Sequence, residues 1–548
     1  MKITRLWICF TLLFILLIGS TSTSGRAAQT SFDNDALLCA EIGNTEMDTR
    51  PEERPEEKQE EWMRWTLEDG CLTVSGEGIL RVGTMAPWYD QRAEITTVIV
   101  EGGITVIGSN TFMHCPNLVS VSLPDTLTAI HSHAFWGCER LQSIAIPHGV
   151  TSLGDFAFSN CERLTSVSLP NTLMEIGAHA FSSCSSLQSI DLPTNLRTIG
   201  SAAFRMCSNL QSIALPDGIT RLEDLMFDEC TSLTDVTLAQ HLTYIGFGAF
   251  QGCSALATID LPDSLAEIDR MAFWGCAALA DITLPEGLSK LGSHAFENCD
   301  SLTQFTFPKG IPWVPDGILS HCDNLQTITF APGTRYIGMD AFAHCKSLKV
   351  LTLPATINQI EWNAFQGCTA LEEIHITDVM AFCSIRYPDS NTNPLHLGAG
   401  LYLNGQIVTE LVIPEGWTAI NAYVFSGYQY LQSVSFPEGF TSIGSYAFRD
   451  CTNLRSINLP STIETIHEGA FRNCYNLKQG YYGGTQEQMR QILVYPDNDA
   501  LISLSWQLPP QNMLPIYIGT YVVCDLISAA PSLIGLIIIF VLKRKRRI

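Results

Sequence analysis

Residues 164–184 read LTSVSLPNTLMEIGAHAFSSC, and close variants of this stretch follow one another through most of the chain. Cysteine marks the period, because cysteines in the same position of successive variants stand 23 residues apart. A constant spacing of this length is the sequence signature of a stacked repeat. We call these residues the register cysteines: Cys115, Cys138, Cys161, Cys184, Cys207, Cys230, Cys253, Cys276, Cys299, Cys322, Cys345, Cys368, Cys451 and Cys474.

The repeating unit can be written LxxIxLPxxLxxIGxxAFxxCxx. Alternating apolar positions in LxxIxLP predict a strand whose Ile and Leu side chains point inward, and proline ends it. LxxIG predicts a second extended stretch, and AFxxC predicts a tight helical turn that places Phe in the core. One unit cannot bury its apolar face alone, but stacked units can. The pattern therefore predicts a repeat solenoid with short parallel strands, one per coil, in a long sheet.

The period fails at one place. Cys368 and Tyr428, which holds the cysteine position of a later unit, are separated by 60 residues, or 14 more than two periods. We therefore expect an enlarged coil near 379–404. The pattern also extends backward to Ile95, which predicts about fifteen coils over residues 95–482.

Both ends of the chain carry targeting patterns. Lys2 and Arg5 precede an apolar run that is followed by small residues, which predicts a secretory signal. An uncleaved anchor is the alternative interpretation. Ile516 to Leu542 is largely apolar and runs into a basic tail, which predicts one transmembrane helix with its tail in the cytoplasm. Together these patterns predict a single-pass, membrane-anchored protein of the cell surface whose repeat domain is extracellular.

The remaining segments complete the expected organisation. Glu46 to Glu61 is acidic and proline-containing, which indicates a solvated linker or, alternatively, a cation-binding tract. Trp62, Trp65 and Trp88 stand among short alternating stretches and suit a cap over the first open edge of a solenoid. The predicted segments are a signal peptide (1–28), an acidic linker (29–61), a β-rich N-terminal cap (62–94), the solenoid (95–482), a C-terminal cap and linker (483–515), a transmembrane helix (516–542) and a basic cytoplasmic tail (543–548).

Composition limits the classes of function. The chain has 548 residues, of which 46% are hydrophobic and 16% charged, a balance typical of a folded protein. The formal net charge is −24, and basic residues are scattered apart from the C-terminal tail. A nucleic-acid partner is therefore not expected. The membrane is expected to contact the chain through the C-terminal helix.

The register cysteines could form disulfides, bind metal or act as nucleophiles. Their regular placement makes each equivalent to its neighbours, and a catalytic residue is rarely repeated in this way. A CxxC pair, which would favour zinc, does not occur. We interpret them as buried, mostly reduced thiols that pack in the core. We expect no catalytic residue, no cofactor and no metal.

Histidine offers a second candidate for chemistry. His321 and His344 both precede a register cysteine one coil apart, and His114 holds the same position at the start of the repeat. Two stacked imidazoles could share a metal, but we interpret them as polar turn residues. No Ser-His-Asp order, phosphate loop, HExxH or GxSxG element is visible. The sequence therefore predicts that the protein is not an enzyme.

Two groups of residues are candidates for ligand binding. The outward positions of the first strands are small and polar, without the aromatic and Arg anchors that dominate tight interfaces; we single out Ser189, Asp191, Thr258 and Asp260. The enlarged coil reads IRYPDSNTNPLHLGAGLYLNG at 385–405 and is rich in turn residues. It predicts a protruding loop that carries the specificity of the protein, with candidates Tyr387, Asn391, Asn393 and His396.

The unit LTSVSLPNTLMEIGAHAFSSC resembles the BspA-like leucine-rich repeat family of bacterial and protist surface proteins, and the resemblance spans about Ile95 to Tyr482. NPLHLGAGLYLNGQIVTELVIPEG is similar to a variant coil of that family, and YYGGTQEQM to its terminal segment. The module WTLEDGCLTVSGEGIL with APWYD is similar to segments that precede such repeats. A wall-sorting LPxTG element, which the resemblance would also suggest, is only approximated around Leu508 and Leu514, and this favours a simple membrane anchor.

The resemblance implies adhesion to host or neighbouring cells through an extracellular protein or glycan ligand. A structural spacer or envelope component without a specific ligand is the alternative, because the outward strand positions are plain. An enzyme is the third hypothesis and rests only on scattered histidines and thiols.

Overall fold

The structure is a computed structural model that describes residues 63–81 and 86–509. These residues all belong to one compact unit. The predicted signal peptide, acidic linker, transmembrane helix and basic tail lie outside the described residues, as does Trp62. Among the residues described, no helix is long and apolar enough to cross a membrane.

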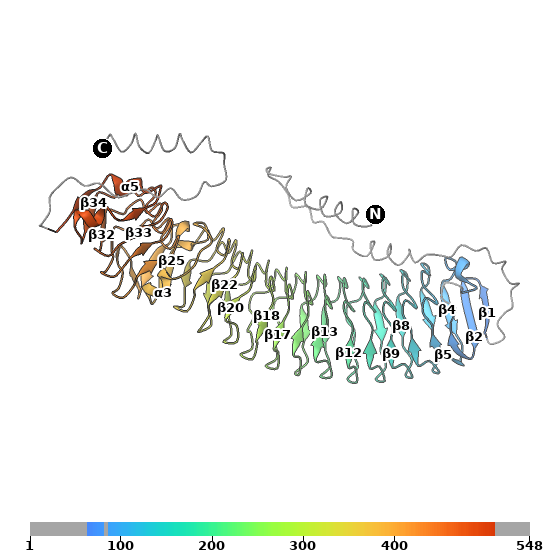
Figure 1. The fold of residues 1–548 in the computed structure, drawn as a ribbon. Coiled ribbons are helices and arrows are strands. Elements are labelled where there is room, and N and C mark those ends of the chain that lie inside the picture. Colours follow the sequence, from blue (N-terminus) through green and yellow to red (C-terminus); the bar gives the residue numbers. More distant parts are fainter. Residues whose placement is uncertain (1–62, 82–85, 510–548) are drawn as a thin grey trace, which may run out of the picture. The chain divides into compact units, whose positions relative to one another are not determined.

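Most regular coils contribute two short strands, one from LxxIxLP and one from LxxIG. Strands of the same kind stack on each other in parallel, one coil after the next (Figure 1). Ser143 pairs with Ser166 on the first side, and Ser152 pairs with Glu175 on the second, so partners stand one period apart. The predicted solenoid of stacked parallel strands is confirmed.

The strands fall into two series. The LxxIxLP series and its continuations at both ends comprise β2 (Cys71–Gly76), β4 (Thr97–Val100), β6 (Ser120–Ser122), β8 (Ser143–Ala145), β10 (Ser166–Ser168), β13 (Ser212–Ala214), β15 (Asp235–Thr237), β19 (Gln304–Thr306), β21 (Thr327–Thr329), β23 (Val350–Thr352), β25 (Glu373–Ile376), β28 (Glu410–Val412), β30 (Ser433–Ser435), β32 (Ser456–Leu459), β34 (Gln479–Tyr482) and β36 (Ser505–Gln507). The LxxIG series comprises β3 (Gly78–Leu80), β5 (Ile104–Ile107), β7 (Ala129–Ile130), β9 (Ser152–Leu153), β11 (Glu175–Ile176), β12 (Thr198–Ile199), β14 (Arg221–Leu222), β16 (Tyr244–Ile245), β17 (Glu267–Ile268), β18 (Lys290–Leu291), β20 (Trp313–Val314), β22 (Tyr336–Ile337), β24 (Gln359–Ile360), β29 (Ala419–Ile420), β31 (Ser442–Ile443), β33 (Thr465–Ile466) and β35 (Leu493–Val494).

The expectation of one long sheet is wrong. Strand pairing is interrupted several times on both sides, so the coils form a row of short sheets. On the first side, for example, no strand is assigned at residues 258–260 or 281–283. Most strands of regular coils are only two or three residues long. Pairing therefore depends on very few hydrogen bonds per coil.

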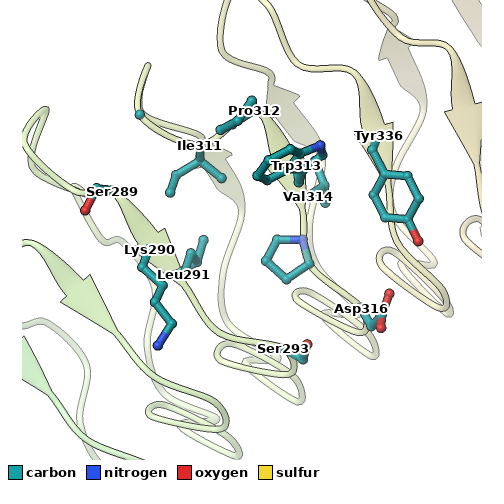
Figure 2. Close-up of a pocket in the computed structure, with 12 residues that line it drawn as sticks. Ser289, Lys290, Leu291, Ser293, Ile311, Pro312, Trp313, Val314, Asp316 and Tyr336 are labelled. Atoms are coloured by element: carbon teal, nitrogen blue, oxygen red, sulfur yellow. The ribbon is translucent and has the colours of Figure 1, made fainter.

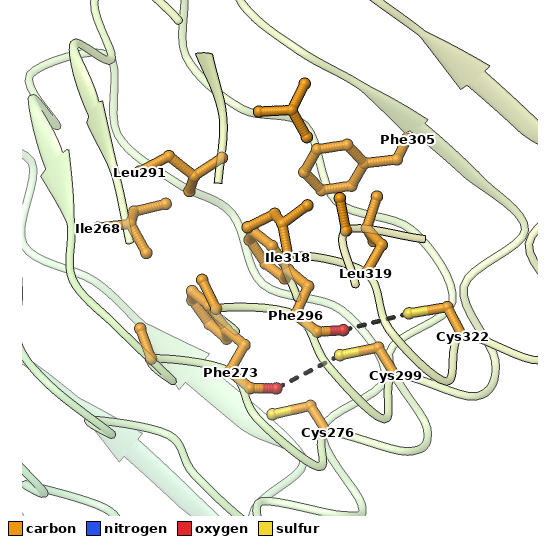
Figure 3. Packing of buried hydrophobic residues seen from close by; sticks show 14 of the residues in the cluster. Ile268, Phe273, Cys276, Leu291, Phe296, Cys299, Phe305, Ile318, Leu319 and Cys322 are labelled. Carbon is orange, nitrogen blue, oxygen red and sulfur yellow. Dashed lines mark hydrogen bonds between the residues drawn. The ribbon is translucent and has the colours of Figure 1, made fainter. Parts of the chain in front are cut away.

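The core is a column of identical side chains from successive coils. Buried Ile144 lies between exposed Ser143 and Ala145, as strand alternation predicts. The phenylalanines that precede the register cysteines stack on one another from Phe112 to Phe296, with ring centroids 5.2–5.8 Å apart. Figure 3 shows Phe273 and Phe296 in this column. The inward assignment of Phe is therefore confirmed.

The AFxxC segment is tight, but it does not form a helix. In the coil that ends at Cys161, Phe156 and Asn160 have positive φ angles of 56° and 58°, which interrupts any helix because L-residues adopt this conformation only singly. The backbone N–H of Phe158 then donates to Ala180 O of the next coil at 2.8 Å. The N–H groups in between bond within the turn, as Ser159 N does to Phe156 O at 3.2 Å, so internal bonds alternate with bonds to the neighbouring coil, which does not happen in a helix.

The register cysteines lie beside the Phe column. All are buried and none forms a disulfide in the structure. In most coils the thiol donates a hydrogen bond to the backbone carbonyl of the preceding coil, as from Cys207 Sγ to Phe181 O at 3.2 Å. Figure 3 shows the same contact from Cys299 to Phe273. The thiol is small enough for the turn and supplies a donor to a buried carbonyl, which explains why cysteine suits this position.

The stretch that exceeds the period folds against the solenoid. It forms α3 (Val379–Cys383), the 3-10 helix η3 (Pro394–Leu397) and an antiparallel hairpin of β26 (Gly400–Leu403) and β27 (Gln406–Ile407). In the coil that follows, Tyr428 replaces the register cysteine and is fully buried. Its hydroxyl donates to Val408 O at 2.7 Å, so the larger side chain ties the hairpin to the core.

Additional elements lie at both ends of the stack. β1 (Met63–Glu68) pairs antiparallel with β2, and Trp88, just before the 3-10 helix η2 (Tyr89–Gln91), stacks on Phe112 with ring centroids 5.8 Å apart. At the other end, α4 (Gln486–Met489) and α5 (Asp499–Ile502) follow the last coil. Buried Asn498 accepts a hydrogen bond from Phe471 N at 2.9 Å, in place of a further coil.

We expect Phe204→Ala to destabilise the protein by about 3–5 kcal/mol, because Phe204 is fully buried and a large cavity would remain. Chemical denaturation should show the loss. Met174→Ala is the matched control, since Met174 is 52% exposed and its truncation should cost less than about 0.5 kcal/mol. Equal stability of the two variants would contradict the stacked-core assignment.

We expect stability to fall steeply in alkaline solution. Burial raises the pKa of Cys161, Cys207 and Cys474 to about 12, whereas an unfolded thiol titrates near pH ~8.5. Above that pH the unfolded state loses protons that the folded state keeps. Each such thiol therefore lowers the free energy of unfolding by about 1.4 kcal/mol per pH unit, and its full stabilising effect is present only below the unfolded pKa.

Denaturation curves between pH 7 and pH 10.5 measure this slope. Cys207→Ala should reduce it by the contribution of one thiol. Stability that is independent of pH over this interval would show that the thiols are accessible to solvent in the folded state.

Candidate ligand-binding site

The four outward candidates on the first strand series are exposed, but they do not form one site. Ser189 and Asp191 flank buried Ile190, and Thr258 and Asp260 flank buried Ile259. The two pairs stand three periods apart, which corresponds to roughly 14 Å at the usual strand spacing. They are therefore separate polar positions on the same side of the repeat.

The enlarged coil does not present its four candidates together. Asn391 and His396 are exposed, as expected of a loop. Tyr387 is only 6% exposed and Asn393 is fully buried. The expectation that these two side chains belong to a protruding loop is wrong, because the segment packs against the coil that follows it.

Asn393 has a structural role. Its side-chain carbonyl accepts from Leu395 N at 3.0 Å, and its amide donates to Tyr423 O and Val424 O at 2.8 Å and 2.6 Å. The side chain thus caps η3 and bonds the enlarged coil to the next coil. Such a fully satisfied buried amide is a packing device and offers nothing to a ligand.

The histidines occupy the turns. His321 and His344 stack with ring centroids 4.4 Å apart, as their positions predict. His114 lies against Trp136, and burial together with the Arg92 charge lowers its pKa, which favours the neutral ring. Nowhere in residues 63–81 and 86–509 do three His, Cys, Asp or Glu side chains gather in a way that could hold a metal ion.

The most distinctive surface lies in a coil that the sequence reasoning did not single out. Residues 302–322 read LTQFTFPKGIPWVPDGILSHC, and Pro312 and Pro315 stand where regular coils have residues with a backbone N–H. In the coil before this one, the residues at the two equivalent positions bond to their own preceding coil. Ser289 N donates to Ala266 O at 2.9 Å, and Gly292 N donates to Ile268 O at 2.8 Å. Proline has no N–H. The two corresponding bonds to the preceding coil therefore cannot form.

The loss of these bonds opens the second side of the solenoid. β18 ends one sheet and β20 begins the next. Between them lies a groove of about 650 Å³, lined by side chains that include Lys290, Trp313 and Tyr336. The coils meet again beyond it, where His294 N donates to Asp316 O at 2.9 Å. The opening is therefore local and leaves the stack intact.

Figure 2 shows how the groove is built. Lys290 on β18 and Trp313 on β20 lie on opposite sides of it, and Ser293 and Asp316 lie at its lower end. Trp313 is 64% exposed, although tryptophan is normally covered. Lys290 pairs with Glu267 of the preceding coil. The groove thus combines an exposed indole with several polar groups.

The core of the same coil is rearranged to tolerate the opening. Ile318 and Leu319 replace the usual Ala and Phe, and Phe305 and Phe307 replace the usual Ile and Leu. Figure 3 shows Phe305 packed beside Ile318 and Leu319. Phe305 contacts Phe296 with ring centroids 5.2 Å apart, which continues the aromatic column across the gap. The side chains on one side of the coil are larger than usual and Leu319 on the other side is smaller than the usual Phe, so the core stays filled.

The sequence contained a signal for this groove. PKGIPWVPDGIL is the stretch in which two prolines interrupt the LxxIG segment, and it also carries the exposed Trp313. This signal is a change of residue type at constant length, which is less visible in the sequence than the change of length at 379–404.

Comparison with known proteins agrees with the repeat. The family described as "BspA type Leucine rich repeat region (6 copies)" matches the chain over residues 88–185, 151–280, 267–386 and 396–492. A search of curated proteins finds no significant match.

Similar solved structures come from several bacteria. A leucine-rich repeat protein of Bacteroides ovatus is 23% identical, with a TM-score of 0.48, and the match covers 77% of this chain and 98% of that one. The T. pallidum leucine-rich repeat protein is 30% identical over 37% of this chain and 91% of its own, with a TM-score of 0.30. A leucine-rich cell surface protein of Faecalibacterium prausnitzii is 23% identical over 80% and 98%, with a TM-score of 0.28.

The family match extends over well more than half of the chain and coincides with the stacked coils of the structure. The chain belongs to the BspA-type leucine-rich repeat family.

Proposed function

We propose that this chain is a non-catalytic interaction protein of the cell surface, which binds an extracellular protein or glycan and so mediates adhesion. The groove beside Trp313 is the observation that carries the proposal. An exposed tryptophan does not stabilise a regular repeat, and neither does the loss of two backbone hydrogen bonds between coils. Departures of this kind from the local rule are expected at functional sites.

The two ends of the chain support the proposed location. The basic and apolar start predicts export, and the apolar segment at 516–542 followed by basic residues predicts a single membrane span. In this arrangement the solenoid is extracellular, β1 and the segment after Tyr482 cover its two ends, and the surface of the coils is available to ligands outside the cell.

A structural spacer is the second candidate, and the small polar positions of the first strand series favour it. Ser189, Asp191, Thr258 and Asp260 offer no large side chain that could anchor a partner. The two hypotheses make different predictions for deletions. The function of a spacer depends on how many coils are present, whereas the function of a binding protein depends on the coil that carries the site.

Deletion of one whole period tests the two candidates. Removing Leu302–Asn324 removes the coil with Trp313, and removing Leu187–Asn209 removes one regular coil, so the two variants have equal length. The full-length chain and both variants are applied to arrays of extracellular-matrix proteins, glycans and bacterial surface material. We expect the full chain and the Leu187–Asn209 deletion to bind, and the Leu302–Asn324 deletion to lose binding.

Thermal unfolding of both variants controls for folding. A full-length chain that binds no component of the arrays contradicts the interaction function. Equal loss of binding in two folded variants would show that the ligand does not depend on the groove beside Trp313.

A further inference from the structure

The backbone at the groove lacks hydrogen-bond donors that neighbouring coils possess. In regular coils the carbonyls equivalent to Ser289 O and Leu291 O accept from the next coil, as Ala266 O and Ile268 O do. Here the residues that would donate are Pro312 and Pro315. Both carbonyl-bearing residues line the groove. Two strong acceptors therefore lack the donors that the repeat normally provides, and a bound molecule can supply them.

The exposed indole of Trp313 defines the second requirement of the ligand. Its flat apolar face is in contact with water, and covering that face is favourable. Tyr336 holds the same position one coil further on and also lines the groove. A ligand that fits must present a flat apolar face to the aromatic side chains and hydroxyl or amide donors to the carbonyls.

Charge excludes several ligands. The only basic side chain of the groove is Lys290, which already pairs with Glu267, and Asp316 lies at the other end. A polyanion such as nucleic acid needs a basic surface, and the formal net charge of the chain is −24. Asp316 already accepts a hydrogen bond from Met339 N at 2.8 Å, so both charged side chains of the groove have partners within the protein, and an uncharged ligand suits the groove best.

The geometry also disfavours an added peptide strand. Affinity in strand addition comes from a row of backbone hydrogen bonds, but β18 and β20 are each only two residues long. A lipid tail would in turn need a wholly apolar lining, whereas Ser289, Lys290, Ser293 and Asp316 place polar groups among the apolar side chains of the groove. The volume of about 650 Å³ suits a small ligand or one or two rings of a larger one.

We propose that the groove between β18 and β20 is a binding site for a neutral glycan, in which a pyranose ring stacks on Trp313 and its hydroxyls donate to Ser289 O and Leu291 O. The C–H groups on one face of a pyranose make that face apolar, and the hydroxyls at its edge are donors, so one ring meets both requirements at once. This inference rests on the proposed interaction function and assigns it a ligand class and a site.

Titration of the full-length chain with neutral hexasaccharides tests the site. The probes are hexamers of glucose, mannose, galactose, xylose and N-acetylglucosamine in their common linkages, followed by calorimetry. We expect at least one to bind, Trp313→Ala to weaken binding by about tenfold or more, and Trp313→Phe to retain most of it. Trp362→Ala is the matched control, because Trp362 is 44% exposed and does not line the groove.

A second variant tests the role of the prolines without removing the aromatic ring. Pro312→Thr combined with Pro315→Gly restores the residue types of regular coils, and with them the two missing N–H groups. We expect this variant to fold with an unchanged or higher melting temperature, to close the groove and to lose glycan binding.

Several results would overturn the inference. These are failure of every hexasaccharide to bind, glycan binding that Trp313→Ala leaves unchanged, and binding that survives in the double proline variant. Trp313-dependent binding of a proline-rich peptide or a polyuronate in place of the neutral probes would also overturn it. Binding to a matrix protein that is insensitive to Trp313 would overturn the groove assignment and leave the general interaction function standing.

Discussion

Backbone hydrogen bonds between consecutive coils are the constraint on which the rest of the molecule depends. Thr151 N donates to Thr128 O at 3.0 Å, and the equivalent donor and acceptor recur one period later along the repeat. Each coil is too small to bury its own apolar side chains, so it is stable only when its neighbours are in register. A period of constant length is the simplest way to keep donors opposite acceptors through the whole stack.

The repeated core residues follow from the same constraint. Because each coil lies directly on the last, a side chain in one position meets its own copy, and Phe therefore stacks on Phe. The register cysteine recurs for a different reason. Its thiol donates a second hydrogen bond to the carbonyl of the Phe in the preceding coil, which also accepts from the backbone N–H of the cysteine in its own coil, as Phe181 O does from Cys207 Sγ and Cys184 N. Burial raises the pKa of these thiols and keeps them neutral, which makes them packing groups and poor nucleophiles.

The groove at Trp313 shows what happens where the constraint is relaxed. Two prolines remove two donors, and the coils separate only where those donors would have been. The fold survives because bonds such as His294 N to Asp316 O hold the coils together elsewhere, and because Phe305 fills the core beside Leu319. A site made in this way uses the backbone of the repeat as part of its binding surface, so it needs few specialised side chains.

The 23-residue pattern by itself determined the solenoid, the inward Phe and Cys positions and the parallel register, because these depend only on which residues recur at equal spacing. Only the tertiary structure decided three other features. Asn393 and Tyr387 are buried, since whether a long insertion protrudes or packs depends on the neighbouring coil. The AFxxC turn is not helical, because every second N–H group bonds to the next coil. The local sequence pattern cannot predict how bonds within a coil compete with bonds between coils. The groove exists because missing amides act on the preceding coil, a contact between residues that lie about one period apart in the chain.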